Sequence, residues 1–285
     1  MNQVSRRTLI GCTAAALANG RACPTNAGNA GAADTTAADG TAAVKDWWPR
    51  EFKTLVTLGE STTAGGWASS RQRCWANQLA RLINEFQRVP VQLVNVGIGA
   101  NVISTRSPSY DHSGKPAALE RLDAHVVRHQ PDLLVVSYGL NDARGGTPKT
   151  LFERELRRLV EEVRGKIQPL IVLLGPYFMT GFDKYGPHWN QASLEVFQQF
   201  NGVIAEVAKQ ERCLFVDLLG AYGGAEWLVH HDAVHANDLG HRLVANKIFE
   251  ILASHCSGLA RETQVLEQQI PPWRDESVLR QAGQK

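Results

Sequence analysis

The stretch Leu55-Val56-Thr57-Leu58-Gly59-Glu60-Ser61 joins a short, mostly apolar run to a glycine and a serine. A run of this kind that ends in a glycine is typical of a strand followed by a turn. Gly59 permits a tight bend, and exposed backbone amides in such a turn can face an anion. The stretch therefore predicts a strand and a strand-to-helix turn that carries Ser61.

Four further apolar runs follow at intervals too long for hairpins: Val91–Val94, Leu133–Val136, Leu170–Leu174 and Leu214–Val216. The runs at 133 and 170 are almost continuously apolar, which indicates strands covered on both faces, as in parallel sheets. Residues 151–163 and 196–207 show the spacing of amphipathic helices. This alternation predicts an α/β fold, a three-layer α/β/α sandwich of about five parallel strands that collects ligands at the carboxyl ends of the strands.

The N-terminus has the features of an export signal. Ser5-Arg6-Arg7-Thr8-Leu9-Ile10 precedes a short, mildly apolar stretch, and Ala16-Leu17-Ala18 fits a cleavage site of small residues. Residues 1–18 are therefore expected to be a Tat-type signal peptide, and the protein to be exported to the periplasm or the medium. A cytosolic N-terminus that happens to contain two arginines is the alternative, and Cys23 as a lipid-anchor site is a minor one.

Two further terminal segments differ in composition from the middle of the 285-residue chain. Residues 19–48 are rich in Ala, Gly and Thr and too poor in apolar side chains to offset the entropy of ordering, so we expect a linker. Residues 257–285 form a polar tail without a convincing period. A single domain over 49–256 is the resulting expectation.

Composition narrows the classes of partner. The formal net charge is only +2, and basic residues are scattered among acids, which argues against a nucleic-acid partner. The N-terminal apolar stretch is far shorter than the roughly 20 residues of a membrane-spanning helix.

Cys74, Cys213 and Cys256 are too far apart for a metal knuckle, and they are either core residues or partners in a disulfide that the sequence does not pair. Nothing in the sequence specifies the oligomeric state.

Asp232 and His235 provide a carboxylate and an imidazole three residues apart. A carboxylate at this spacing can orient the imidazole, which can then remove the proton from a serine such as Ser61. The plainer alternatives are that Asp232 caps the helix expected from Ala236 and that Ser61 caps the helix after its own strand. A zinc pair of His231 and His235, four residues apart, is a further alternative.

Two further strand ends carry amide groups that suit acyl transfer. Asn141 lies in Gly139-Leu140-Asn141-Asp142, after the most apolar strand, where its side chain could donate to an oxyanion. Residues 95–101, with Gly97, Gly99 and Ala100, could direct a backbone N–H at the same oxygen. Both segments also read as ordinary turns.

Taken in order, four blocks of the chain resemble those of the SGNH (GDSL-type) hydrolase superfamily. The blocks are Gly59-Glu60-Ser61, Asn95-x-Gly97-x-Gly99-Ala100, Gly139-x-Asn141-Asp142 and Asp232-x-x-His235. The resemblance covers about residues 54–255 and implies a flavodoxin-like fold and ester hydrolysis by an acyl-enzyme mechanism. It implies no metal or organic cofactor.

The resemblance also implies roles for individual residues. Ser61 corresponds to the nucleophile and first oxyanion donor, and Ala100 and Asn141 correspond to the other two oxyanion donors. His235 corresponds to the base and Asp232 to the acid that orients it. Glu60 and Ala100 depart from the family, which usually has Asp and Gly there, so we expect activity to be retuned or reduced at worst.

The substrate is expected to be a small-molecule or polysaccharide ester. The long aromatic segment 176–189 follows the fourth strand, so Tyr177, Phe178 and Trp189 are expected to line the substrate pocket, and Trp67 and Trp75 lie near Ser61 in sequence. Together with export, this favours an esterase that removes acyl groups, acetyl in particular, from a carbohydrate. The alternatives are a lysophospholipase or thioesterase of the same superfamily and a catalytically silent carbohydrate-binding domain.

Overall fold

The computed structural model describes residues 45–269 and 275–282. The expected signal peptide at 1–18 and the linker up to residue 44 lie outside these ranges, as do residues 270–274 and 283–285 of the expected tail. The proposed cleavage site and Cys23 therefore also lie outside the described residues.

Five parallel strands form one sheet in the order β2-β1-β3-β4-β5. Their bounds are β1 Thr54–Gly59, β2 Gln92–Asn95, β3 Leu133–Ser137, β4 Leu170–Leu174 and β5 Leu214–Val216. Every residue of β3 and β4 is buried, as expected of continuous apolar runs covered on both faces. The predicted sandwich with about five parallel strands is confirmed.

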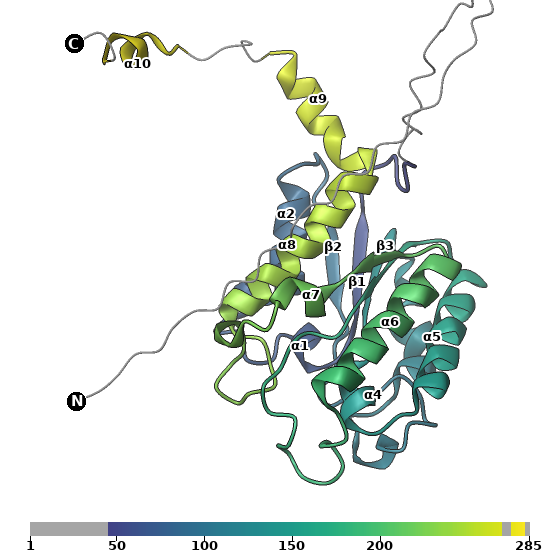
Figure 1. The fold of residues 1–285 in the computed structure, drawn as a ribbon. Helices are drawn as coiled ribbons and strands as arrows, with labels where there is room; N and C mark the ends of the chain where they lie inside the picture. Colours follow the sequence, from purple (N-terminus) through teal and green to yellow (C-terminus); the bar gives the residue numbers. More distant parts are fainter. Residues whose placement is uncertain (1–44, 270–274, 283–285) are drawn as a thin grey trace, which may run out of the picture. The chain divides into compact units, whose positions relative to one another are not determined.

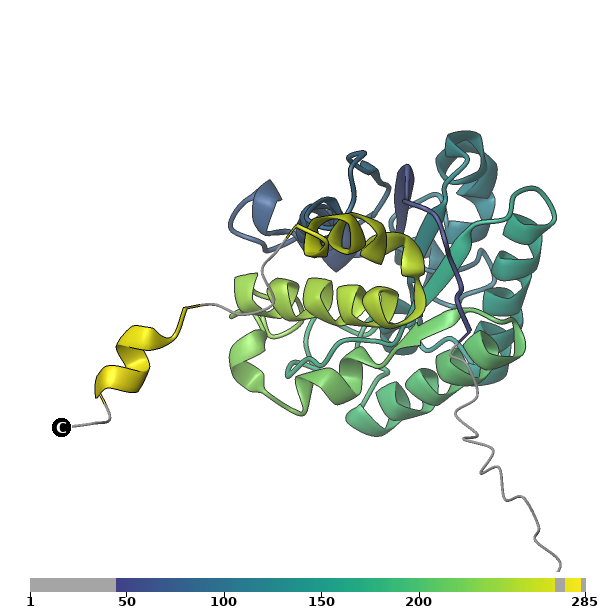
Figure 2. The same ribbon diagram turned by 90° about the horizontal axis from the view of Figure 1, so that it is seen from above.

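Helices cover both faces of the sheet. The α-helices are α1 Ser61–Ala64, α2 Trp75–Asn84, α3 Leu122–His125, α4 Leu140–Arg144, α5 Lys149–Arg164, α6 Leu194–Gln210, α7 Leu218–Tyr222, α8 Asp238–His255, α9 Arg261–Glu267 and α10 Ser277–Ala282. Short 3₁₀ helices occur at η1 Arg71–Arg73, η2 Tyr110–His112, η3 Ala118–Arg121, η4 Val127–His129, η5 Glu226–Leu228 and η6 Ser257–Ala260. Helix α2 packs on α8, and α5 packs on α6, on opposite sides of the strands (Figures 1 and 2).

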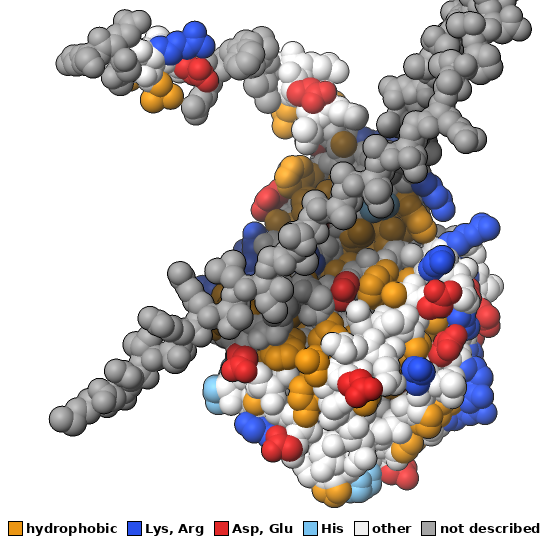
Figure 3. Space-filling model, in the orientation of Figure 1, with side chains coloured by type: hydrophobic (Ala, Val, Ile, Leu, Met, Phe, Trp, Pro, Cys, Tyr) orange, Lys and Arg blue, Asp and Glu red, His pale blue; other side chains and the backbone are white. Residues whose placement is uncertain are grey.

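The amphipathic pattern of α5 explains how one of these layers is fixed. Its apolar residues Phe152, Leu156, Leu159 and Val163 are buried, while its arginines and most of its glutamates lie on the outer side. Acidic and basic side chains are mixed on the face of the molecule seen in Figure 3. Burial of the apolar stripe, at about 1.5–3 kcal/mol per large side chain, holds α5 on the sheet.

The packed region extends slightly beyond the expected boundaries of 49 and 256. Trp47 N–H donates to the carbonyl of His255 at 2.8 Å, and Trp48 and Leu259 are buried. Cys74, Cys213 and Cys256 are buried free thiols. Within residues 45–269 and 275–282, no helix combines the length and the apolarity that crossing a membrane requires.

Candidate active site

The predicted site residues meet at one edge of the sheet because the carboxyl ends of parallel strands lie together. Ser61 opens α1 directly after β1, and Asn141 lies in α4, two residues after the turn that follows β3. Asp232 and His235 lie in the segment between η5 and α8. Residues from three distant parts of the chain thus share one location.

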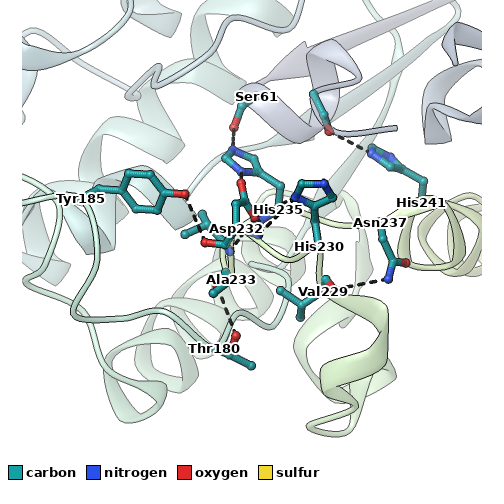
Figure 4. Close-up of polar contacts among 12 residues, drawn as sticks. Ser61, Thr180, Tyr185, Val229, His230, Asp232, Ala233, His235, Asn237 and His241 are labelled. Carbon is teal, nitrogen blue, oxygen red and sulfur yellow. Dashed lines mark hydrogen bonds and ion pairs between the residues drawn. The ribbon is translucent and has the colours of Figure 1, made fainter. Parts of the chain in front are cut away.

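Ser61, His235 and Asp232 form a hydrogen-bonded row (Figure 4). Ser61 Oγ lies 2.8 Å from His235 Nε2, and His235 Nδ1 lies 2.5 Å from Asp232 Oδ2. Ser61 is 7 % exposed and His235 is 9 % exposed, so both are shielded from bulk water. Because Oγ contacts the imidazole at the first residue of α1, Ser61 does not serve as the cap of that helix.

A tight turn holds the carboxylate and the imidazole together. Asp232 Oδ1 accepts the N–H groups of Val234 and His235, both at 3.1 Å, while Oδ2 faces the ring. Ala233 adopts a left-handed φ of 68°, and its carbonyl accepts from Gly181 N–H at 2.8 Å. One carboxylate thus fixes both the backbone of the turn and the orientation of His235.

The position of this turn bears on two alternatives: Asp232 as a helix cap, and His231 with His235 as a zinc pair on a helix. Helix α8 begins only at Asp238, and its cap is Asn237, whose Oδ1 accepts from the N–H groups of Leu239 and Gly240. Asp232 is therefore not a helix cap. His231 and His235 precede the helix, so they do not form a pair on one helical face.

Burial and hydrogen bonding set the protonation of the row. Burial lowers the pKa of His235 below its ordinary value, with the bond to Asp232 opposing this shift. Burial raises the pKa of Asp232, but its hydrogen bonds with His235 and Val234 outweigh this, so the net pKa is lowered. At neutral pH the imidazole is neutral and the carboxylate ionised, the state in which Nε2 can accept a proton from Ser61.

Three N–H groups at this edge are placed to donate. Ser61 N–H lies in the first turn of α1, where no intrahelical acceptor exists. Ala100 N–H has no acceptor among the described residues. Asn141 Nδ2 donates one of its two hydrogens to the Asn101 carbonyl at 3.2 Å, which leaves the other one available. Ala100 reaches its position with φ 53°, a left-handed conformation that disfavours a side chain and suits the glycine usual in the family.

Glu60 ties the first strand end to the third. Its side chain is buried, and Oε1 accepts the N–H groups of Gly139 and Asn141, both at 3.2 Å. Burial and the nearby Asp142 raise the pKa of Glu60 well above its ordinary value. Burial likewise raises the pKa of Asp142 to about 7. The residue that departs from the family therefore braces the backbone that carries Asn141.

Arg121, buried beneath the site, also holds neighbouring strand ends together. Its buried guanidinium donates to the carbonyls of Val96 and Gly59, to Asn101 Oδ1 and to Tyr138 Oη, at 2.5 to 3.3 Å. It thus links the ends of β1, β2 and β3. Gly97, which follows β2, lets the backbone of α1 approach closely, because a Cβ at this position would lie 2.2 Å from Ala64 N.

A cavity of about 340 Å³ opens beside Ser61 Oγ. The residues that line it are Ser61, Trp67, Gly99, Ala100, Asn141, Arg144, Tyr185, Trp189 and His235. Trp67 stacks on the His235 ring with the centroids 3.5 Å apart, and Tyr185 Oη donates to the Asp232 carbonyl at 3.1 Å. The proposed nucleophile, base and donor residues all line this one space, whereas Asp232, which orients the base, does not.

Two expected pocket residues lie elsewhere. Tyr177 is 2 % exposed, and its hydroxyl lies 3.1 Å from Ser137 Oγ beneath the site. Phe178 packs on the core, and neither residue lines the cavity. Both come shortly after β4 ends at Leu174, where the chain still packs on the core. Of the three expected wall residues only Trp189 lines the cavity, and Trp75 is a core residue.

Sequence reasoning did not single out Arg121, Arg144 or Tyr185. A lone arginine in a helical segment ordinarily indicates a solvated side chain, and neither arginine belongs to a motif. Tyr185 lies within the aromatic segment that was expected to form the wall, but nothing distinguishes it there from its neighbours. Only the fold reveals that Arg144 and Tyr185 line the cavity and that Arg121 is buried beneath it.

A doubly wound parallel sheet with a serine, a histidine and a carboxylate in a row at its carboxyl edge is typical of a serine-dependent ester hydrolase. Residues 57–243 match the GDSL-like lipase/acylhydrolase family. The chain belongs to this family, and it is a carboxylic ester hydrolase. The family and the enzyme class predicted from the sequence are both confirmed.

Solved structures share the fold at low sequence identity. A lipase/acylhydrolase from Enterococcus faecalis is 21% identical with a TM-score of 0.56, and the match covers 70% of this chain and 95% of that one. An acetylxylan esterase from Geobacillus stearothermophilus is 20% identical with a TM-score of 0.55, covering 72% and 95%. An α/β hydrolase from the metagenome of Lake Arreo, Spain, is 20% identical with a TM-score of 0.54, covering 71% and 95%. A search of curated protein sequences finds no significant match.

Proposed function

We propose that the protein removes acyl groups, acetyl in particular, from a carbohydrate or another small ester through an acyl-enzyme on Ser61. The observation that carries this proposal is the 2.8 Å contact between Ser61 Oγ and His235 Nε2, at the mouth of a cavity that also holds Ala100 and Asn141. A nucleophile, its base and the donors for an oxyanion then surround one reacting carbonyl.

The proposed cycle has two halves. Ser61 Oγ attacks the ester carbonyl carbon while His235 Nε2 takes its proton, and Asp232 stabilises the imidazolium. The N–H groups of Ser61 and Ala100 and the side chain of Asn141 hold the oxyanion. The bond to the alcohol oxygen breaks, and that oxygen receives the proton from His235. Water then attacks the acyl-enzyme with the same proton transfers, which frees the carboxylic acid and restores Ser61.

Three observations support a short acyl group on a sugar. The cavity of about 340 Å³ lies near the lower end of the roughly 300–1,000 Å³ typical of small-molecule sites, which favours a small substrate. Trp67, Tyr185 and Trp189 give it aromatic faces, which suit stacking on sugar rings. An acetylxylan esterase is also among the structures that share the fold. A lysophospholipase or thioesterase would need room for a longer acyl group, and a silent binding domain would not need the Ser61–His235 contact.

Labelling and chain-length kinetics test this proposal. The purified protein is treated with a fluorophosphonate probe and assayed on p-nitrophenyl esters of two to twelve carbons, alongside Ser61→Ala. We expect labelling and fastest hydrolysis of the acetyl ester, both lost in Ser61→Ala. Ser254→Ala, which alters an exposed serine of α8, serves as the matched control. Preference for long chains would favour the lipase-like alternative, and absence of Ser61-dependent turnover would favour the binding domain.

The pH profile tests the assignment of the base. His235 must be neutral to accept the serine proton, and burial lowers its pKa below the ordinary 6.5. The acid limb of kcat/KM should therefore be centred below pH 6.5. An acid limb centred well above 6.5 would contradict this assignment.

We further propose that the protein acts outside the cytoplasm, from the twin arginine Arg6-Arg7 and the apolar residues after it. The test is to express the full chain with Arg6→Lys and Arg7→Lys and to compare cell fractions with those of the wild type. Export should be lost in the double variant, and unchanged export by a Tat-deficient strain would contradict the proposal.

A further inference from the structure

Arg144 is a buried cation in the wall of the cavity beside Ser61. It ends α4, three residues after Asn141, and only 5 % of it is exposed. It nevertheless lines the cavity together with Ser61 and His235. Since charged side chains are rarely buried without partners, its hydrogen bonds require an explanation.

The protein supplies almost no acceptor for this guanidinium. Its one hydrogen bond runs from Nη1 to Asn141 Oδ1 at 3.4 Å, and Nε is buried without any partner. Among the described residues Arg144 forms no ion pair within 4.0 Å. Arg121, the buried arginine beneath the site, donates instead to four protein oxygens. The Nε of Arg121 is likewise buried without a partner, so the contrast lies in the Nη groups, which Arg121 commits to the fold and Arg144 leaves largely free.

The nearby carboxylates are already committed to other groups. Glu60 Oε1 accepts two backbone N–H groups, and Asp232 binds His235 and its own turn. Tyr185 and Trp189 instead present ring faces to the guanidinium, with centroids 5.4 and 6.0 Å from Cζ. Aromatic faces confine a guanidinium in a plane without neutralising its charge. The planar fork is thereby left for an acceptor inside the cavity.

We infer that Arg144 binds a carboxylate of the substrate that lies close to the scissile ester; this rests on the proposed function of Ser61. Guanidinium and carboxylate match as planar, two-pronged partners, and the bond is strongest where water is excluded. With a carbohydrate as the alcohol part, the substrate is an acylated uronic acid. With the carboxylate on the acyl part, it is a half-ester of a dicarboxylic acid.

Two matched substrate pairs test this inference and separate the two sources of the carboxylate. The first pair is the monoacetylated methyl glycosides of galacturonic acid and galactose, which differ in a carboxylate against a hydroxymethyl group. The second is p-nitrophenyl hemisuccinate and p-nitrophenyl valerate, which differ at the end of the acyl chain. We expect the wild type to favour the carboxylate in one pair by roughly 10- to 100-fold in kcat/KM, as a charge-assisted hydrogen bond supplies.

Variants at Arg144 make the test specific. Arg144→Gln should abolish the preference, and Arg144→Lys should retain part of it because the charge remains without the fork. Arg128→Gln, an exposed arginine of η4, is the matched control and should keep the wild-type ratio. Equal losses on both members of each pair would instead make Arg144 a positioning residue for Asn141 and overturn the inference.

The wild type alone also decides the question if the variants do not fold. Free galacturonate should inhibit hydrolysis of p-nitrophenyl acetate more strongly than galactose does if the carboxylate is on the alcohol part, and succinate should inhibit it more strongly than succinamide does if the carboxylate is on the acyl part. Ser61-dependent hydrolysis of p-nitrophenyl acetate without any carboxylate preference would overturn the role of Arg144 and leave the proposed function intact. Absence of that hydrolysis would overturn the proposed function itself.

Discussion

The turn after β1 and the loop after β4 both form walls of the site, but the protein holds them very differently. Every residue from Leu55 to Thr63 is buried, and Glu60 and Arg121 join this turn to its neighbours. Residues 183–188 of the loop are exposed, and Tyr185 is 53 % exposed. The loop is tied to the site chiefly through Ala233 and Asp232. We therefore expect the reaction chemistry to depend on the buried framework and the substrate fit to depend on the exposed loop.

Asp232→Asn should have the largest effect on the buried framework. The amide cannot stabilise the imidazolium, and it favours the wrong tautomer of His235, so kcat should fall by about 10⁴-fold. The measurement is steady-state hydrolysis of p-nitrophenyl acetate. The bond to Asp232 also raises the pKa of His235, so any residual activity should have its acid limb at a lower pH than the wild type. A variant within tenfold of the wild type would remove Asp232 from the proposed mechanism.

Asn141→Ala should have the next largest effect. It removes one of the three proposed oxyanion donors, which lowers kcat by about 10²- to 10³-fold and changes KM little. Comparison of kcat with KM on the acetyl ester checks this. Asn77→Ala alters an asparagine of α2 outside the cavity and should leave kcat unchanged. A loss confined to KM would assign Asn141 to ground-state binding instead.

Glu60→Asp tests the brace between the first and third strand ends. The shorter side chain withdraws the acceptor from Gly139 N–H and Asn141 N–H, and each unpaired buried donor costs about 1–3 kcal/mol. We expect a lower Tm and a loss of roughly tenfold in kcat as Asn141 shifts. Glu60→Gln keeps the length and an acceptor oxygen, and it should lie closer to the wild type. Equal stability of Glu60→Asp and the wild type would contradict the bracing role.

The contrast between buried framework and exposed segments also explains which strands and helices could be predicted from the sequence. Strands β3 and β4 were predictable because burial on both faces leaves continuous apolar runs. The edge strand β2 begins one residue later than its apolar run, because Val91 N–H bonds to Asn84 Oδ1 rather than to the sheet. Residues 96–132 carry only 3₁₀ turns and the short α3, for which the sequence offers no period.

The site was predictable where chemistry restricts the residue type. Ser61 and Asn141 follow strand ends, and Asp232 and His235 precede α8, all in recognisable blocks. The structure brings them to one edge, while their catalytic roles stay predictions for the variants above to test. The wall was less predictable, because an aromatic residue after a strand can turn inward, as Tyr177 does, or toward the cavity. Burial of Arg144 depends on contacts between distant segments, which no local pattern encodes.

Tyr185→Phe should have the smallest effect on kcat, because it changes only the exposed loop. The change removes only the hydroxyl that donates to the Asp232 carbonyl, and keeps the ring over Arg144. A half-exposed hydrogen bond contributes about 0.5–1.5 kcal/mol at most, so kcat should change by no more than about tenfold. Tyr185→Ala also removes the ring and should raise KM while leaving kcat near that of Tyr185→Phe. If Tyr185→Phe instead lowers kcat as much as Asn141→Ala does, the loop helps to hold the Asp232 turn in place, and the division between framework and wall fails at Tyr185.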